Sequence, residues 1–348
     1  MGPEGSDIYA EGLLIPPCTL VEAGEMAIAE VPNGVYLSSL IVDGYESDIE
    51  LKATLTISDC DMLLDFEGTD PCSQKGINVP LNYATAYSVF ALRCIVGSDI
   101  PNNAGSLAPF RVVAPEGCIL NAQAPAPVAM RHTIGQLTPD LVYGCLHQAL
   151  PERVPAEGAS CMYDLPLRST PEAAQGDGHQ FAIELVFNGG TGARARKDGL
   201  SVTAFPSGVW GSQVETTESV AAVLIKKREL RIDSGGAGRY RGGLGQRIEL
   251  QPSGGDDILL FLSLERIRFA ARGRDGGKAG AVGRVSIGTD GEPLPSKGLI
   301  RIPANETLIF ETPGGGGMGD PQARDAELLA TDIRDGLVSE QSAKLDYR

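Results

Sequence analysis

The sequence is poor in several kinds of residue, and each shortage excludes a class of protein. Aromatic residues make up 5% of the 348 residues, and the only histidines are His132, His147 and His179. No H-E-x-x-H or H-x-H pair occurs, so the sequence carries no signature of a zinc site. No apolar run reaches the roughly 18 residues that span a bilayer. The sequence therefore predicts no metal centre and no membrane span.

Positive charge is also in short supply. The chain has 29 Lys and Arg against 45 Asp and Glu, a net charge of −16 at pH 7. A nucleic-acid-binding protein needs a basic face that neutralises phosphates, and anionic membrane surfaces attract basic segments. The composition therefore predicts that neither nucleic acid nor a membrane is a partner.

Cysteine usage and the N-terminus both indicate a cytoplasmic protein. The 7 cysteines are odd in number, lie in the first half of the chain and form no C-x-x-C. That pattern suits free thiols in a reducing compartment better than a disulfide framework. The N-terminal MGPEGSDIYAEG lacks the basic region and apolar core of a secretory signal.

The first half of the chain alternates strand and helix signals. In LKATLTI (51–57) apolar and polar residues alternate, which predicts a strand with one buried face, and turn signals on both sides extend this to an antiparallel meander over 34–68. Residues 110–121 predict a strand and turn. Helical spacing predicts a helix over 80–97, with Gly97 as its C-cap. A second helix is predicted over 138–151, with Thr138 as N-cap and Pro139 as first helical residue.

The second half predicts short strands between glycine-rich turns, as expected of a chain with 44 Gly. From Pro321 onward the pattern is helical. We therefore predict an α+β fold, β-rich, with mostly antiparallel strands, a few packed helices and a C-terminal helical tail. The predicted divisions are an irregular segment (1–33), an α+β domain (34–160), a β-rich domain with glycine turns (161–320) and the helical tail (321–348).

The loop TPGGGGMGDP (312–321) resembles a phosphate-binding loop. Gly314, Gly316 and Gly319 match the dinucleotide fingerprint G-x-G-x-x-G. A true fingerprint opens a βαβ unit, but here only a helical pattern follows and no second strand. We interpret the loop instead as a sharp turn that leaves a strand, packs close to neighbouring backbone and starts the C-terminal helix, with Pro321 in its first turn.

Three glycine-rich loops with charged neighbours, together with other short motifs, resemble the hydantoinase B / 5-oxoprolinase family. The resemblance runs in collinear order over nearly the whole chain. It rests on IYAEGLLIPP (8–17), LDFEGTDP (64–71), the run from GINVPL to ALRC (76–94), IPNNAG (100–105), APEGCILN (114–121), RHT (131–133), QALPERVPA (148–156), GGTGAR (189–194), DSGGAGRYRGGLG (233–245), ETPGGGGMGDP (311–321) and DIRDGLVS (332–339).

The resemblance implies a division of labour. An A-type partner, similar to actin-like ATPases, phosphorylates the carbonyl oxygen of a small cyclic amide, and the B-type part completes ring opening, or carboxylation in related enzymes. It implies no cofactor on this chain. ATP and a divalent metal are expected on the partner or on the family's N-terminal part, which carries histidine and aspartate metal motifs. The expected assembly is a hetero-oligomer.

The chain departs from the family pattern in two places. It begins near the family's IYxEGLxIPP motif, and the long helical segment expected after LVEAGEM (20–26) is missing. The chain is then a natural fragment, one half of a split subunit, or an incomplete sequence.

Three of the matching motifs contain candidate site residues. Arg131 can hold a phosphate or carboxylate with two N–H groups, and His132 can act as acid or base near neutral pH, although a lone histidine is commonly structural. The glycines of GGTGARARKDG (189–199) permit close approach of a substrate, and the alternative is a salt-bridged turn. The residues assigned to substrate binding are Asn78, Gly189, Gly190, Gly192, Arg194 and Asp198.

Several functions stay open. The first is the B-type subunit of an ATP-dependent hydrolase of 5-oxoproline-like or hydantoin-like rings. The others are a subunit of an ATP-dependent ketone carboxylase, a non-catalytic scaffold that docks an A-type partner, and an inactive fragment. Bicarbonate dependence would separate the carboxylase from the hydrolase.

Overall fold

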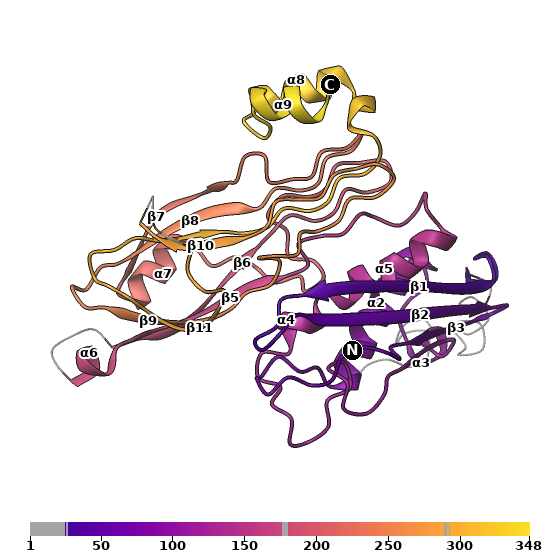
Figure 1. Ribbon diagram of the computed structural model, residues 1–348, viewed down its shortest axis with the longest axis horizontal. Coiled ribbons are helices and arrows are strands. Elements are labelled where there is room, and N and C mark those ends of the chain that lie inside the picture. Colours follow the sequence, from indigo (N-terminus) through magenta and orange to yellow (C-terminus); the bar gives the residue numbers. More distant parts are fainter. Residues whose placement is uncertain (1–24, 26, 176–179, 289–290, 292) are drawn as a thin grey trace, which may run out of the picture.

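The computed structural model describes residues 25, 27–175, 180–288, 291 and 293–348, and it contains two large hydrophobic cores (Figure 1). The first core draws on residues from Ile28 to Val154, and the second on residues from Ala159 to Phe310. We call these parts the first and the second unit. Each buries enough apolar surface for a core of its own, whereas the predicted domain boundaries stay a prediction.

The first unit is built on a four-stranded sheet. Its strands are β1 (Gly34–Val42), β2 (Ile49–Ser58), β3 (Asp61–Asp65) and β4 (Phe110–Val113), and they lie in that order. The first three pair antiparallel, as the predicted meander requires, and β4 runs parallel to β3. The apolar residues of LKATLTI are all buried in β2, so the strand and its buried face are confirmed.

Two long helices cover one face of this sheet. They are α2 (Leu81–Ile95) and α5 (Thr138–Ala149), which pack on each other. Gly97 lies just beyond α2 with φ +66°, a conformation that favours glycine at a helix end. Leu137, not Thr138, occupies the N-cap position of α5. The short helix α4 (His132–Gly135) runs directly into α5, and the Thr138 hydroxyl donates back to Gly135 O at 2.8 Å.

The second unit packs two antiparallel four-stranded sheets face to face. One has the order β10-β12-β8-β7 and the other β11-β9-β5-β6. The strands are β5 (Met162–Ser169), β6 (Ala182–Asn188), β7 (Val223–Leu230), β8 (Gln246–Pro252), β9 (Ile258–Ser263), β10 (Arg284–Ile287), β11 (Lys297–Ile302) and β12 (Leu308–Glu311). Three short helices lie outside the sheets: α3 (Ala104–Leu107) in the first unit, and α6 (Pro171–Gln175) and α7 (Val214–Val220) in the second. The predicted α+β class is confirmed.

Glycine-rich segments leave the second unit side by side and form what we call the glycine bundle: 189–200, 234–245, 271–281 and 312–319 (Figure 1). Consecutive N–H groups of Gly315 and Gly316 donate to Gly243 O at 3.0 Å and Glu157 O at 2.8 Å. A Cβ on Gly315 would lie 2.0 Å from Thr191 O, so the backbones pack where no side chain fits.

The predicted close packing of TPGGGGMGDP (312–321) is therefore confirmed. The predicted sharp turn is wrong for residues 312–318, which run extended. The N–H groups of Gly314 to Gly317 each bond to another segment, which requires an extended chain. The turn comes at Gly319, which has φ +74°. Pro321 then starts a 3-10 turn, η1 (Pro321–Ala323).

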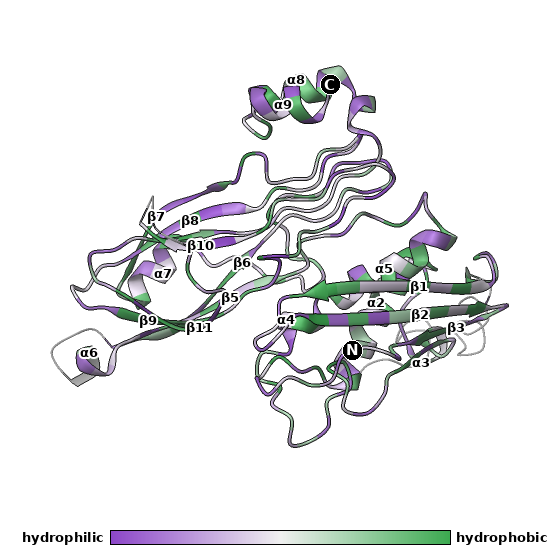
Figure 2. Cartoon of the chain, in the orientation of Figure 1, coloured by the Kyte–Doolittle hydropathy of each residue, from purple (hydrophilic) through white to green (hydrophobic). Residues whose placement is uncertain are grey.

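The C-terminal region is helical, as predicted, but it forms two helices after η1. These are α8 (Ala326–Arg334), capped by the Asp325 side chain, and α9 (Glu340–Asp346), capped by Ser339. Gly336, with φ +70°, separates them. Figure 2 shows green and purple residues on both helices, in keeping with one buried face. In the described part of the chain, no helix has the length and apolar character needed to cross a membrane.

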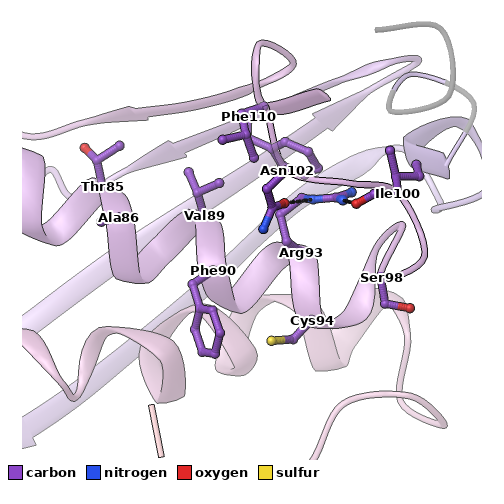
Figure 3. A pocket seen from close by; sticks show the side chains of 11 residues that line it. Thr85, Ala86, Val89, Phe90, Arg93, Cys94, Ser98, Ile100, Asn102 and Phe110 are labelled. Carbon is purple, nitrogen blue, oxygen red and sulfur yellow. Dashed lines mark hydrogen bonds between the residues drawn. The ribbon is translucent and has the colours of Figure 1, made fainter. Parts of the chain in front are cut away.

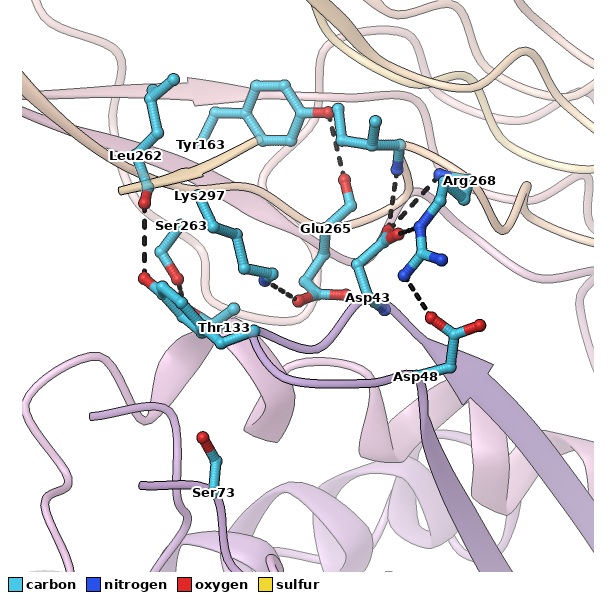
Figure 4. A network of polar contacts seen from close by, with 12 residues as sticks. Asp43, Asp48, Ser73, Thr133, Tyr163, Leu262, Ser263, Glu265, Arg268 and Lys297 are labelled. Atoms are coloured by element: carbon cyan, nitrogen blue, oxygen red, sulfur yellow. Dashed lines mark hydrogen bonds and ion pairs between the residues drawn. The ribbon is translucent and has the colours of Figure 1, made fainter. Parts of the chain in front are cut away.

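A buried polar network joins the two units (Figure 4). Asp43, after β1, donates its N–H to Glu265 Oε2 at 2.9 Å, and its carboxylate accepts from the N–H of Ile267 at 3.0 Å. Lys297 donates to Glu265 Oε1 at 2.6 Å. Burial raises the pKa of Glu265 to about 7, although Lys297 acts in the opposite direction. Because these partners come from both units, the network fixes how the units sit together.

Candidate functional site

Arg131 and His132 lie at the start of α4, where His132 faces the second unit and Arg131 packs on Tyr83 of the first. His132 Nε2 is 3.6 Å from Asp164 Oδ2 on β5, and the guanidinium of Arg131 lies 5.8 Å from the centroid of the Tyr83 ring. Burial lowers the pKa of His132. Burial and the neighbouring carboxyl of Glu184 raise the pKa of Asp164 to about 7. Burial therefore favours the uncharged form of both side chains, and their 3.6 Å separation is longer than a hydrogen bond.

Asn78 lies in the first unit with its side chain fully buried. Its Nδ2 donates to the carbonyl oxygens of Ser73, Lys75 and Pro127 at 2.9, 3.0 and 2.9 Å, and its Oδ1 accepts from Ser73 N at 2.8 Å. These bonds saturate the amide. In this structure Asn78 holds loops together.

The predicted glycines of the second unit lie in the glycine bundle. A Cβ on Gly189 would lie 2.4 Å from Pro313 O, one on Gly190 would lie 1.9 Å from Gly243 O, and one on Gly192 would lie 1.9 Å from Ala156 O. All three positions therefore require glycine for backbone packing.

Arg194 and Asp198 bond to each other through the backbone. The Arg194 guanidinium donates to Asp198 O at 2.7 and 3.1 Å. The Asp198 carboxylate accepts from Arg324 at 2.8 and 2.9 Å. Burial alone would raise the pKa of Asp198, but the hydrogen bonds from Arg324 outweigh it and lower this pKa. Asp198 thus ties its loop to the C-terminal region.

Gly192 and Arg194 line a cavity of about 480 Å³ between α2, α5 and the loop 191–200. Asn78, Arg131, His132, Gly189, Gly190 and Asp198 do not line it. Its wall carries Tyr143, Phe205 and Leu200, and its charged side chains include Arg153, Arg194, Arg196 and Lys197. An apolar wall with a basic rim at the junction of two units is the usual form of a small-molecule site.

Aromatic rings form the apolar wall of this cavity. Tyr143 and Phe205 stack with ring centroids 6.5 Å apart and an angle of 13° between their planes. Phe90 of α2 lies 5.8 Å from Phe205 and packs behind this wall without lining the cavity. Such a wall can hold the flat face of a small ring.

Asp140 lines the same cavity and belongs to a buried ion cluster. Its Oδ2 accepts from Arg266 Nη2 at 2.8 Å, and its Oδ1 accepts from Gly158 N at 3.2 Å. Arg266 Nη1 also reaches Glu157 Oε2 at 3.3 Å. Burial raises the pKa of Asp140 to about 6, although Arg266 acts against this. A carboxyl group with such a pKa can take or give a proton near neutral pH.

A second cavity, of about 720 Å³, lies on the outer face of α2 (Figure 3). Val89, Phe90 and Phe110 make most of its wall apolar. Its guanidinium, that of Arg93, is engaged by Ile100 O, Val96 O and Asn102 Oδ1. Its described lining residues include no Asp, Glu or His, and burial raises the pKa of the Cys94 thiol, so we assign no catalytic group to it.

The described residues do not fit a metal centre. Across 25, 27–175, 180–288, 291 and 293–348, no three His, Cys, Asp or Glu side chains are arranged to hold a metal ion. Catalytic zinc sites need three such protein ligands. The divalent metal that the family resemblance implies has no donor set in this part of the chain.

Sequence reasoning missed Asp140, Arg266 and the aromatic wall. Asp140 reads as an ordinary acidic residue in the first turn of a helix, and its partner Arg266 lies 126 residues away. One local sign was available, because Phe205 and Leu200 flank the predicted glycine loop. Such an assembly is not visible from spacing alone, since its members meet only in the folded chain.

A family model described as hydantoinase B/oxoprolinase matches residues 25–321. An uncharacterized protein of Methanocaldococcus jannaschii is 31% identical over 86% of this chain and 52% of its own length. The caprolactamase subunit beta of Pseudomonas jessenii is 32% identical over 68% of this chain and 42% of its own length.

Solved structures share the fold. The crystal structure of the ATP-dependent caprolactamase of Pseudomonas jessenii has a TM-score of 0.81 at 26% identity, covering 95% of this chain and 59% of that chain. The nucleotide-free acetone carboxylase structure has a TM-score of 0.79 at 18% identity, covering 94% and 51%. The chain thus spans about half the length of the relatives it matches.

Proposed function

The chain belongs to the hydantoinase B/oxoprolinase family, and we propose that it is the B-type subunit of an ATP-dependent cyclic-amide hydrolase. The substrate class is a small ring of the 5-oxoproline or hydantoin type. The observation that carries the proposal is the cavity beside Asp140, which joins an aromatic wall, a basic rim and a carboxyl of raised pKa within one family member.

We propose that the subunit works with an A-type partner that uses ATP. The name caprolactamase subunit beta implies a second subunit in that enzyme, and that enzyme's structure is described as ATP-dependent. Among the described residues of this chain, neighbouring backbone fills the space beside the glycine-rich segments, which supports their role in packing. In the proposed complex, ATP and a divalent metal are bound by the partner or by the family's N-terminal part.

We propose a role for each side chain that lines the cavity or supports it. The wall of Tyr143 and Phe205 holds the plane of the ring. Arg153 and Arg194 orient a carboxylate or phosphoryl oxygen. When water adds to the carbon of the phosphorylated amide, Asp140 can take the water's proton and pass it to the ring nitrogen as the C–N bond breaks. The phosphoryl group then leaves as phosphate when a second water hydrolyses the acyl phosphate. Arg266 holds the Asp140 carboxyl in position.

Arg131 and His132 are proposed for a second task in the same reaction. His132 lies beside Asp164, Arg131 lies on Tyr83, and both are outside the cavity, so they would act on a proton path rather than on the ring. If the subunit is only a scaffold, replacing them leaves turnover by the complex intact.

The test starts with co-purification of the chain with candidate A-type subunits. ATP-dependent phosphate release is then measured on 5-oxoproline, hydantoins and lactams, with and without bicarbonate. Ring opening coupled to ATP use supports the proposal, and product formation that requires bicarbonate replaces it with the carboxylase.

Variants of the chain test which residues contribute to turnover. Arg194→Ala and Tyr143→Leu, which removes an aromatic ring from the wall, should raise KM or lower turnover, and Arg131→Ala and His132→Ala test the second task. Arg334→Ala is the matched control, since its side chain is 71% exposed on α8. A stable complex whose turnover is unaffected by any of these variants would contradict a catalytic site in this chain.

A further inference from the structure

A third cavity, of about 440 Å³, lies between β1, the end of α5 and the loop 272–275. Its polar side chains include His147, Glu157, Arg272, Arg274 and Asp275. It shares no lining residue with the cavity beside Asp140. The ion cluster of Asp140, Arg266 and Glu157 separates the two.

Arg274 has an unused binding edge at this cavity. Among the residues that the structure describes, its buried Nε and Nη2 make no hydrogen bond. These two nitrogens form one side of the guanidinium, the side that can hold two oxygens of one oxyanion. The nearby Glu157 is already engaged, because its oxygens accept from Arg266 and Arg272.

His147 also has a nitrogen without a partner. Its Nε2 lies 3.0 Å from Asp275 Oδ1, and its buried Nδ1 makes no hydrogen bond within the described part of the chain. Burial and the charge of Arg274 lower the pKa of His147. In the neutral ring, Nε2–H donates to the Asp275 carboxylate, and Nδ1 is left as an acceptor.

Two residues that line this cavity thus carry three buried nitrogens without a partner among the described residues. Nearly all buried polar side chains in proteins are hydrogen-bonded, and an unpaired buried guanidinium is costly. The two donors of Arg274 match a negative oxygen pair, and the acceptor of His147 matches a hydroxyl. An anion that carries both meets the three needs at once.

We propose that this cavity binds a small protonated oxyanion, hydrogen phosphate or bicarbonate. Arg274 donates to two of its oxygens, and His147 Nδ1 accepts from its hydroxyl. Sulfate and acetate lack the hydroxyl at neutral pH and leave Nδ1 unpaired, so they bind less tightly. The proposal does not depend on the hydrolase activity, because it concerns the binding of an anion by the chain alone.

Calorimetric titration of the full chain tests this with inorganic phosphate, bicarbonate, sulfate and acetate. Phosphate or bicarbonate should bind more tightly than sulfate and acetate. Saturation by phosphate alone assigns the site to phosphoryl oxyanions, and saturation by bicarbonate alone assigns it to the carbonate class. Equal binding of all four anions would overturn the selectivity.

Variants connect binding to the named side chains. Arg274→Met should raise the Kd about tenfold or more, and His147→Leu should reduce the preference for phosphate over sulfate. Arg334→Met is the control, with the same loss of charge at an exposed position. Without anion, Arg274→Met should keep or raise Tm, because a costly unpaired charge is removed. A lower Tm with unchanged anion binding would show that Arg274 is structural and overturn the proposal.

Discussion

The guanidinium of Arg266 lies 2.8 Å from the carboxylate of Asp140, and both side chains are almost fully buried. Asp140 belongs to α5 of the first unit, and Arg266 follows β9 of the second. Arg266 has φ +59°, which is rare for a residue with a side chain. This strained backbone conformation places the guanidinium beside Asp140 and Glu157, and the two ion pairs offset the strain.

Arg266→Met should therefore lower the free energy of unfolding by about 3–5 kcal/mol, since it leaves the buried Asp140 carboxylate without its cation, while Glu157 keeps Arg272 as a partner. Asp140→Asn should cost less, because Arg266 keeps Glu157 as a partner. In the double variant Asp140→Asn/Arg266→Met, the loss should be smaller than the sum of the two single losses. Urea unfolding measures all three.

The exposed pair Arg334 and Asp335 provides the comparison. Its atoms are 3.2 Å apart, and the side chains are 71% and 49% exposed. Arg334→Met should change the unfolding free energy by less than about 1 kcal/mol. If Arg266→Met costs no more than this control, the buried cluster does not hold the units together.

Much of the local structure could be predicted because it depends on short-range patterns. The alternation in LKATLTI shows a strand because every second residue faces the core. The helical spacing in 80–97 found α2 to within two residues at its C-terminal end. Glycine content marked the bundle, since only glycine lets backbones approach this closely.

The remaining features depend on contacts between distant segments. The parallel pairing of β4 with β3 joins strands separated by two helices, and no turn signal announces it. Gly192 and Arg194 could be nominated from their loop. Asp140, Tyr143 and Phe205 could not, because the cavity forms only when α5 meets that loop.

Gly316→Ala should destabilise the protein, because its Cβ would lie 2.2 Å from Arg272 O. Backbone on both sides is held by hydrogen bonds, so it cannot shift without breaking them. We expect the free energy of unfolding to fall by about 1–3 kcal/mol, as at overpacked core positions. Thermal and urea unfolding measure it.

Gly76→Ala is the matched control for that substitution. A Cβ there would lie 3.5 Å from its nearest neighbour, an ordinary contact. Replacing glycine at a compatible position reduces the entropy of the unfolded chain, so this variant should be neutral or slightly stabilising. Equal losses from both variants would contradict the role of close backbone packing in the bundle.

The buried carboxyl of Asp164 should make the protein less stable as the pH rises. Burial and Glu184 raise its pKa from 3.8 to about 7. Between these values the folded chain holds more protons than the unfolded chain, so this group lowers stability as the pH rises from about 4 to about 7. Asp164→Asn removes this contribution to the pH dependence of stability. The variant should therefore be more stable relative to the parent at pH 8 than at pH 5.

The same experiment decides whether Asp164 and His132 act as a charged pair. Urea unfolding of the parent, Asp164→Asn and the exposed control Asp335→Asn at pH 5 and pH 8 gives the difference in unfolding free energy between each variant and the parent. The contributions of titratable groups common to all three proteins cancel in these differences. A charged pair with His132, 3.6 Å away, would instead hold the carboxylate ionised and make Asp164→Asn relatively less stable at pH 8. Since burial lowers the pKa of His132, the imidazole is neutral at that pH and gives the carboxylate no such support. A relative loss of stability at pH 8 would therefore overturn the assignment of Asp164 as a buried carboxyl that keeps its proton to about pH 7.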